Sequence, residues 1–332
     1  MLGIAALASL AFGAVSLSAA DLLAWLLGRG EEHVQIIIEQ LRLPRVICAA
    51  SVGAMLSLAG ACAQGLFRNP LADPSLIGVS AGASLGASLA IVGVGVGGSG
   101  LLATGFWGQF GVVSIGAFSG ALLAAFLVYR FATSGGMTSV VTMLLAGVAL
   151  SYLAGSVSTF LEYMADDQEL RQLSLWKMGG LDMITPAESA LALIALVAMI
   201  VGCWQFRGAL DAFLLGESEA RYLGVNVATV KGSVIAWVAF SVALSVALCG
   251  VITFVGLLVP HVARLIAGPL HKFLLPLSAL LGALLLVLAD LAARLVLAPT
   301  ELPIGLLTAL FGAPLFLWLL YSQLLAARGQ HA

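Results

Sequence analysis

The sequence predicts an all-α polytopic membrane protein with about ten transmembrane helices. Of its 332 residues, 61% are hydrophobic and only 9% are charged, and the mean hydropathy is +1.12. A soluble chain carries about a quarter of charged residues, so lipid is expected to cover much of this protein's exterior. The apolar runs are continuous and do not alternate with a period of two, which favours helices over a β-barrel.

Charges, prolines and glycine clusters divide the chain into ten segments of about 20 residues, the length that crosses a bilayer as a helix. The first segment has no Lys or Arg before Arg29, so it is interpreted as a membrane helix and not as a signal peptide. Gly250 is the predicted break between two helices within one apolar stretch. The predicted spans are 2–27, 46–67, 75–97, 107–131, 138–163, 187–207, 230–250, 252–267, 273–296 and 305–325.

An even number of spans places both termini on one side of the membrane. The inner loops should be richer in Lys and Arg, and cytoplasmic termini give eight basic residues inside against six outside. The bias is weak because several cations fall on the outer side. The whole chain, 1–332, is predicted to form a single transmembrane domain.

Composition and missing motifs exclude several function classes. The net charge of −2 and the absence of a basic patch argue against a nucleic-acid partner. None of the three lysines belongs to a Gly-Lys-Ser/Thr core, so the chain lacks a phosphate-binding loop and any ATP hydrolysis must come from another subunit. The four cysteines form no CxxC pair, and no histidine belongs to a metal motif. We therefore expect no enzyme activity, no metal and no cofactor bound by this chain.

Glycines recur every four residues in segment 78–86, and Gly116 and Gly120 repeat the spacing. Small residues at this spacing let helix backbones approach closely in lipid. The same segment contains two GxSxG strings centred on Ser80 and Ser84, a pattern found in serine hydrolases. That pattern needs a strand–turn–helix context, which an apolar helix does not provide. Helix packing is the favoured interpretation, and an intramembrane hydrolase is the alternative.

Asp290 and Arg294 are four residues apart in an apolar run, on one face of a predicted helix. Charges inside a membrane are usually paired or functional. Mutual neutralisation is the simpler interpretation of this pair. A proton relay through Asp290 would instead indicate a secondary transporter that works without an ATPase.

The segment 215–226 concentrates charges between two spans. Its acidic residues come first and Arg221 follows, an order that suits the dipole of a short helix. A solvated loop would explain the composition equally simply. The more specific prediction is a cytoplasmic helix that docks in the groove of a partner.

Taken together, strings along nearly the whole chain resemble FecCD-type permeases, and look most like the haem permeases among them. These permeases are the membrane subunits of ABC importers for haem, iron-siderophores and cobalamin. The matching strings are RLPR at 42–45, QGLFRNPLADP at 64–74, GVSAG at 78–82, LG at 223–224, FVGLLVPHVAR at 254–264, ELPIG at 301–305 and GAP at 312–314.

The resemblance implies a type II ABC importer permease fold of ten helices in the bacterial inner membrane. It implies a homodimer that works by alternating access with two ATP-binding cassette subunits, which bind ATP and Mg²⁺, and with a periplasmic substrate-binding protein. Segment 215–226 then corresponds to the coupling helix. The residues expected to couple to the ATPase are Glu217, Ser218, Glu219, Ala220, Arg221, Leu223, Gly224, His261 and Arg264.

Two further sites follow from the resemblance. Arg42, Arg45 and Arg294 match outer-face arginines that receive acidic residues of the binding protein, a role that suits the guanidinium fork. Thr138 and Ser139 fall where the family narrows its cytoplasmic gate.

The outer loop from Asp166 to Gly180 looks most like that of haem permeases, although many relatives lack the charge of Lys177 and carry a serine in place of Gly180. Cations at the pore mouth would meet haem propionates, and methionine would offer soft apolar contact. Alternatively, these charges only solvate a loop. Haem is predicted ahead of a ferric siderophore, and a siderophore ahead of cobalamin. The predicted pathway residues are Tyr163, Met164, Arg171, Lys177 and Met178.

Overall fold

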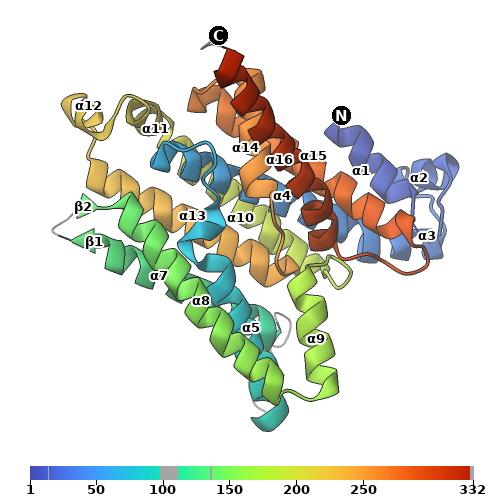
Figure 1. Ribbon diagram of the computed structural model, residues 1–332. Coiled ribbons are helices and arrows are strands. Elements are labelled where there is room, and N and C mark those ends of the chain that lie inside the picture. The colour runs from blue at the N-terminus through green and yellow to red at the C-terminus, as the bar shows by residue number, and fades with distance from the viewer. Residues whose placement is uncertain (14, 98–110, 135–136, 330–332) are drawn as a thin grey trace.

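The computed structural model describes residues 1–13, 15–97, 111–134 and 137–329, which form a helical bundle with one short antiparallel strand pair (Figure 1). The first half comprises α1 Leu2–Ala11, α2 Ala19–Leu26, α3 Glu32–Ile36, a π-helical turn Ile37–Arg42, α4 Leu43–Phe67, a 3₁₀ turn Pro74–Ile77, α5 Val79–Gly97, α7 Val112–Ala132, β1 Thr133–Ser134, β2 Met137–Thr138 and α8 Val140–Met164. The second half comprises α9 Asp167–Met178, α10 Pro186–Trp204, α11 Arg207–Phe213, α12 Glu217–Tyr222, α13 Val227–Cys249, α14 Val255–Ala267, α15 His271–Val296 and α16 Ile304–Gly329.

The predicted spans correspond closely to the apolar helices. Among the described residues, six helices are long and apolar enough to cross a membrane, and four more apolar helices are shorter. The predicted break is confirmed, because α13 ends before Gly250 and α14 starts after Phe254. Both residues have positive φ, +67° and +66°, which turns the chain between the two helices. The start of the fourth predicted span, 107–110, lies outside the described residues.

The prediction of one long first helix over 2–27 is wrong, because α1 and α2 are two short helices. The end of α1 is stabilised by guanidinium groups of Arg42 and Arg294, which donate hydrogen bonds to its last carbonyls. A capping box then starts α2: Asp21 N–H donates to Ser18 Oγ at 3.2 Å, and Ser18 N–H donates to the Asp21 carboxylate at 2.8 Å. Both groups of contacts allow the chain to leave the helix without losing backbone hydrogen bonds.

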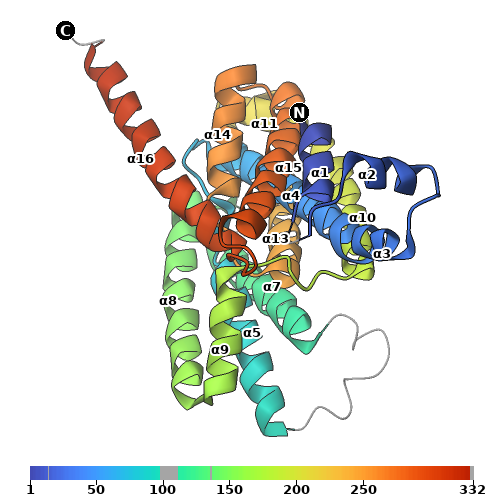
Figure 2. The ribbon, with the colours of Figure 1, turned by 90° about the vertical axis from the view of Figure 1, so that its right-hand side faces the viewer.

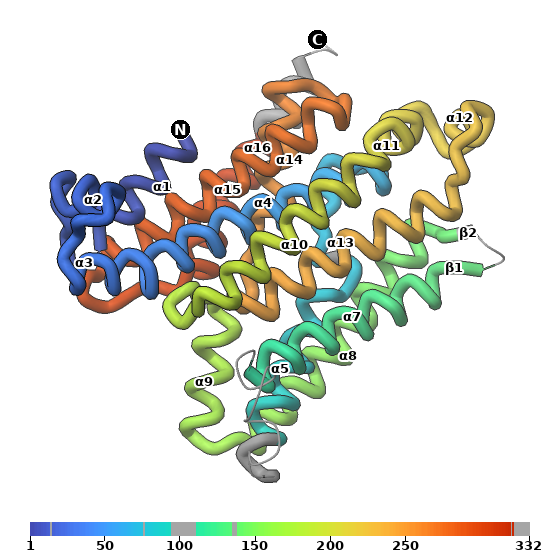
Figure 3. Tube along the Cα trace, turned by 180° about the vertical axis from the view of Figure 1, so that it is seen from behind, coloured from blue at the N-terminus to red at the C-terminus, as the bar shows by residue number. Residues whose placement is uncertain are grey.

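The helical segment that corresponds to the second predicted span, 46–67, is longer than predicted and lies at the centre of the fold. Helix α3, the π-helical turn and α4 form one continuous helical segment, Glu32–Phe67. In the most apolar stretch of this segment, 89% of the residues are buried. Helix α4 packs against α10, α13, α14 and α15, and Figure 3 shows α4, α10 and α13 side by side. Helix α4 and the helices packed on it form the buried centre of the bundle.

Helices α5 and α7 pack at backbone distance, as the glycine spacing predicts. Gly82 and Gly86 in α5 face Gly120 and Gly116 in α7, and a Cβ added at any of the four would overlap a carbonyl oxygen of the other helix. The two GxSxG serines lie inside α5. The glycine ladder is therefore a helix contact, and these serines lack the strand–turn–helix context of a hydrolase nucleophile.

Two helices at the periphery expose apolar faces. Figure 2 shows α16 diverging from the rest of the bundle, and its Leu310, Phe311 and Trp318 are more than 60% exposed. In α8, only 17% of the residues in the most apolar stretch are buried. In Figures 1 and 3, α11, α12 and the far end of α16 lie on one side, which we call the α12 side, and α9 lies on the opposite, α9 side.

Candidate functional site

The charged segment 215–226 contains one short helix, α12, which is shorter than predicted. Glycines with positive φ flank it, Gly216 at +129° and Gly224 at +85°, and these confine the helix to six residues. Glu217 and Glu219 occupy its first turn and Arg221 its last, an arrangement that the helix dipole favours.

The surface of α12 carries apolar side chains that contact little else in this chain. Ala220 is fully buried and anchors the helix, whereas Leu215, Tyr222 and Leu223 are 68%, 91% and 65% exposed. Ser218 and Glu219 are exposed on the same helix. Exposed apolar groups with a polar rim are typical of a surface that binds another protein.

The two predicted gate residues lie in the connection from α7 to α8, where the structure has a small antiparallel strand pair that the sequence did not predict. Thr133 in β1 pairs with Thr138 in β2, and their Oγ1 atoms are 3.0 Å apart. Ser139 caps α8, because its Oγ accepts a hydrogen bond from the Thr142 N–H at 3.3 Å. We call β1, β2 and Ser139 the gate hairpin.

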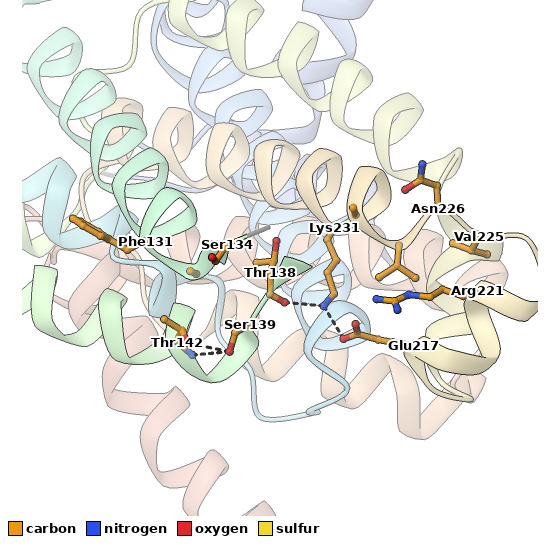
Figure 4. Close-up of a pocket in the computed structure, with 13 residues that line it drawn as sticks. Phe131, Ser134, Thr138, Ser139, Thr142, Glu217, Arg221, Val225, Asn226 and Lys231 are labelled. Carbon is orange, nitrogen blue, oxygen red and sulfur yellow. Dashed lines mark hydrogen bonds and ion pairs between the residues drawn. The ribbon is translucent and has the colours of Figure 1, made fainter. Parts of the chain in front are cut away.

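Lys231 in α13 joins the gate hairpin to α12, a link that sequence reasoning missed. Its side chain is only 5% exposed. The Nζ atom donates to the Thr138 carbonyl at 3.0 Å and forms an ion pair with Glu217 Oε1 at 2.7 Å (Figure 4). The signal was present in the sequence, since a lysine within an apolar run requires a polar partner, but the sequence did not identify that partner.

A cavity of about 750 Å³ lies beside this link (Figure 4). Its walls come from the gate hairpin, from α12 and from the first turns of α13. Arg221 and Asn226 face it from one side, and Ser134 and Thr142 line it from the other. The gate hairpin and α12 therefore face each other across open space, with Lys231 connecting them at one edge.

The structure does not bring His261 and Arg264 next to α12. Both lie in α14, which packs against α4 and α15, whereas α12 packs against α11 and α13. Gln64 connects α4 to α14. Its Nε2 donates to the Leu257 carbonyl at 3.0 Å, and its Oε1 accepts from Arg264 at 3.4 Å. A role for His261 and Arg264 in contacting an ATPase stays a prediction.

The three predicted docking arginines are buried, with exposures of 7% for Arg42, 9% for Arg45 and 6% for Arg294. Arg45 Nε lies 2.7 Å from Asp290 Oδ1, and Arg45 Nη1 lies 2.8 Å from Glu301 Oε2. Arg294 Nε lies 3.1 Å from the other oxygen of Asp290. The predicted mutual neutralisation of Asp290 and Arg294 is confirmed, and Arg45 and Glu301 extend it into a network.

The remaining guanidinium donors satisfy the end of α1. Arg42 donates to the Ala11 carbonyl at 2.9 Å and also to Val15, and Arg294 donates to the Phe12 carbonyl at 3.2 Å. All three arginines therefore have partners within this chain. Binding-protein docking by these residues stays a prediction, and acidic residues of a partner would have to compete with internal contacts.

The predicted pathway residues are spread along the end of α8 and the length of α9, on the α9 side: Tyr163 and Met164 end α8, whereas Lys177 and Met178 end α9. Lys177 forms an ion pair with Glu162, so its charge is already compensated. Arg171 is exposed on α9. Of the two predicted pathway cations, Arg171 is thus the exposed one, and it lies between apolar and sulfur-containing groups at the ends of α8 and α9. The predicted pathway residues are Tyr163, Met164, Arg171, Lys177 and Met178, and the tyrosine and the methionines are 88%, 65% and 45% exposed in chain order.

Comparison with protein families gives a match over almost the whole chain. The model described as the FecCD transport family matches residues 1–322. The hemin transport system permease protein of Yersinia pestis is 42% identical over 329 residues, which cover 97% of this chain and 93% of the relative. The cobalamin import system permease protein of Halobacterium salinarum is also 42% identical, over 298 residues that cover 88% of this chain and 75% of the relative.

Solved structures have the same fold. A metal-chelate type ABC transporter in an inward-facing conformation superposes with a TM-score of 0.82 and 34% identity, and covers 97% of this chain and 96% of the other. The PsaBC complex of Streptococcus pneumoniae with a Fab gives a TM-score of 0.54 at 16% identity, with 89% of this chain and 94% of that chain covered. The second likeness concerns the fold alone.

Proposed function

The chain belongs to the FecCD transport family as the membrane permease of an ABC importer, and we propose that the substrate it carries is haem. It is not itself catalytic, and an importer of this kind requires an ATPase and a binding protein. Its similarity to both hemin and cobalamin permeases supports these two substrate classes ahead of a ferric siderophore. The choice between them rests on the side chains at the α9 side.

Exposed side chains of α8 and α9 carry the proposal for haem. Haem is a flat apolar ring with two carboxylates at one edge, so it suits a surface that pairs a cation with apolar and sulfur-containing groups. Arg171 supplies the exposed cation, and Tyr163 and Met164 supply the apolar contact. Cobalamin is the second candidate, because permeases named for its import are as similar to this chain as the hemin permease.

We further propose the assembly in which this single permease domain works. Two copies would pair in the inner membrane through the exposed apolar faces of α8 and α16, with one ATPase on each α12. The α12 side would face the cytoplasm, which places the end of α16 there as well. Each copy then has three protein contacts: the second copy along α8 and α16, an ATPase at α12 and a binding protein on the α9 side.

In the proposed mechanism, ATP binding moves α12 and the pathway opens to one side of the membrane at a time. The ATPase and the loaded binding protein must each bind one conformation better than the other for this to occur. A proton-coupled carrier is less well supported, because the Asp290 carboxylate is engaged by two guanidinium groups.

The direct test measures ATP-dependent haem uptake into proteoliposomes that hold this chain and its ATPase, with purified binding protein added outside. We expect uptake that needs all three proteins and that resists excess ferric siderophore and cobalamin. Cobalamin uptake without haem uptake would overturn the substrate assignment. Transport by the permease without its ATPase would contradict the ATP-driven mechanism.

Arg171→Glu is expected to lower haem uptake at sub-saturating haem by about tenfold, because one favourable charge-assisted contact becomes a repulsive one. The apparent KM for haem-loaded binding protein should rise while the maximal rate changes little. Arg29→Glu, a change at an exposed arginine in the α2–α3 connection, is the matched control. Equal effects of both variants would show that overall charge, and not the position of Arg171, matters.

A further inference from the structure

The Lys231 ammonium is buried, so it needs polar partners within the protein, whereas water can solvate an exposed cation. Lys231 lies near the start of the membrane helix α13 with a side chain that is 5% exposed. Burying an ammonium in an apolar span is unfavourable, so such residues persist where partners compensate the charge. Here the partners of Lys231, Thr138 and Glu217, belong to the two elements that flank the 750 Å³ cavity.

The contact with Thr138 engages the gate hairpin as a unit. Lys231 Nζ donates to the backbone carbonyl of Thr138, and the side chain of Thr138 lies within hydrogen-bond distance of Thr133 across the strand pair. Ser139, the next residue, caps α8. A displacement of Thr138 is therefore transmitted to both strands and to the start of α8.

The contact with Glu217 engages α12 at its first residue. The 2.7 Å ion pair involves a carboxylate whose side chain is 31% exposed and an ammonium that is almost fully buried. The cavity lies between the gate hairpin and α12, so side chains do not fill all of the space between these two elements. The Lys231 bridge is thus a specific polar connection between elements that have room to move (Figure 4).

We propose that Lys231 is the positioning residue that makes the gate hairpin follow α12 during the transport cycle. This inference rests on the proposed function, in which α12 receives the movement of an ATPase, and on the prediction that Thr138 and Ser139 narrow the pathway. With the bridge intact, displacement of α12 carries the hairpin with it. Without the bridge, α12 moves and the hairpin stays, so ATP is hydrolysed with little transport.

The first readout is the number of haem molecules imported per ATP hydrolysed by the reconstituted full transporter. Lys231→Met removes the charge and the donors at nearly constant length, and we expect this ratio to fall about fivefold or more. Lys231→Arg keeps a charged donor and should retain most of the ratio. Lys272→Met, at an exposed lysine on the same side, is the matched control and should leave the ratio unchanged.

The second readout needs no transported substrate, so it separates failure of the bridge from failure of the haem assignment. Spin labels at Ser134→Cys in the hairpin and Ser218→Cys in α12, both exposed sites, report the distance between the two elements. The four native cysteines are buried. We expect one narrow distance distribution with and without ATP and vanadate in the wild type, and a nucleotide-dependent change in Lys231→Met.

Glu217→Ala removes the carboxylate from the partly exposed end of the same bridge and should shift the distances in the same direction. This variant decides the question if Lys231→Met does not fold. Unchanged distances and an unchanged import ratio in the folded variants would overturn the proposal. Altered distances in a transporter that imports cobalamin would support the bridge and reject only haem.

Discussion

Arg45→Met is expected to lower the free energy of unfolding by about 3–5 kcal/mol, because it removes one partner of a buried ion network. Arg45 joins Asp290, which is fully buried, to Glu301, which is partly exposed. Its loss leaves Asp290 with Arg294 alone and leaves Glu301 without the arginine. The thermal midpoint in detergent and the denaturant midpoint should both fall.

Two variants test the interpretation of this result. Arg45→Lys should be intermediate, since one ammonium cannot match the guanidinium fork that reaches two carboxylates. Arg29→Met, at an exposed arginine, should change stability by less than about 0.5 kcal/mol. A normal melting temperature for Arg45→Met together with weakened binding-protein affinity would contradict the structural role and favour docking.

Gly60→Ala is expected to destabilise the fold by about 3 kcal/mol, at the upper end for overpacking, because α4 and α14 meet there at backbone distance. A Cβ added at Gly60 would overlap the carbonyl oxygen of Gly256. Gly60 lies in the buried helix α4, and Gly256 lies in α14, which packs against it. Relief of the overlap requires a shift of one helix backbone, which would disturb the other contacts of α4.

Gly208→Ala in α11 is the matched control, since a Cβ added at this exposed position meets no atom within 4 Å. The same change should stabilise here by about 0.5–1 kcal/mol, because alanine restricts the unfolded chain more than glycine. The two variants should therefore shift the midpoint of thermal unfolding in opposite directions. Stabilisation by both changes would show that the higher helix propensity of alanine, and not close packing, dominates at Gly60.

Local patterns predict much of this fold because each depends on a short stretch of sequence. Continuous apolar runs identify the spans, and Gly250 identifies the break between α13 and α14. The spacing of four glycines predicts the contact of α5 with α7, since it is set by the helical period alone. The order of charges around Arg221 likewise predicts a helix that the structure has in shorter form.

The misses have a common origin. The first predicted span, 2–27, is apolar enough to be one helix, but arginines from elsewhere in the chain satisfy the end of α1. Arg42 and Arg294 looked like exposed outer cations because the sequence does not show what covers them. The gate hairpin is too short for any periodicity to reveal.

The amino-acid sequence is sufficient to identify an α-helical membrane permease, to locate most of its helices and to predict the close approach of α5 and α7. The partners of its buried charges, in contrast, depend on how the helices pack in three dimensions. Arg45 and Asp290 are 245 positions apart in the sequence, and Lys231 and Thr138 are 93 apart. Hydropathy and helical period act over one or two turns, whereas a buried charge is compensated by whichever distant segment the packing of the bundle brings within about 3 Å.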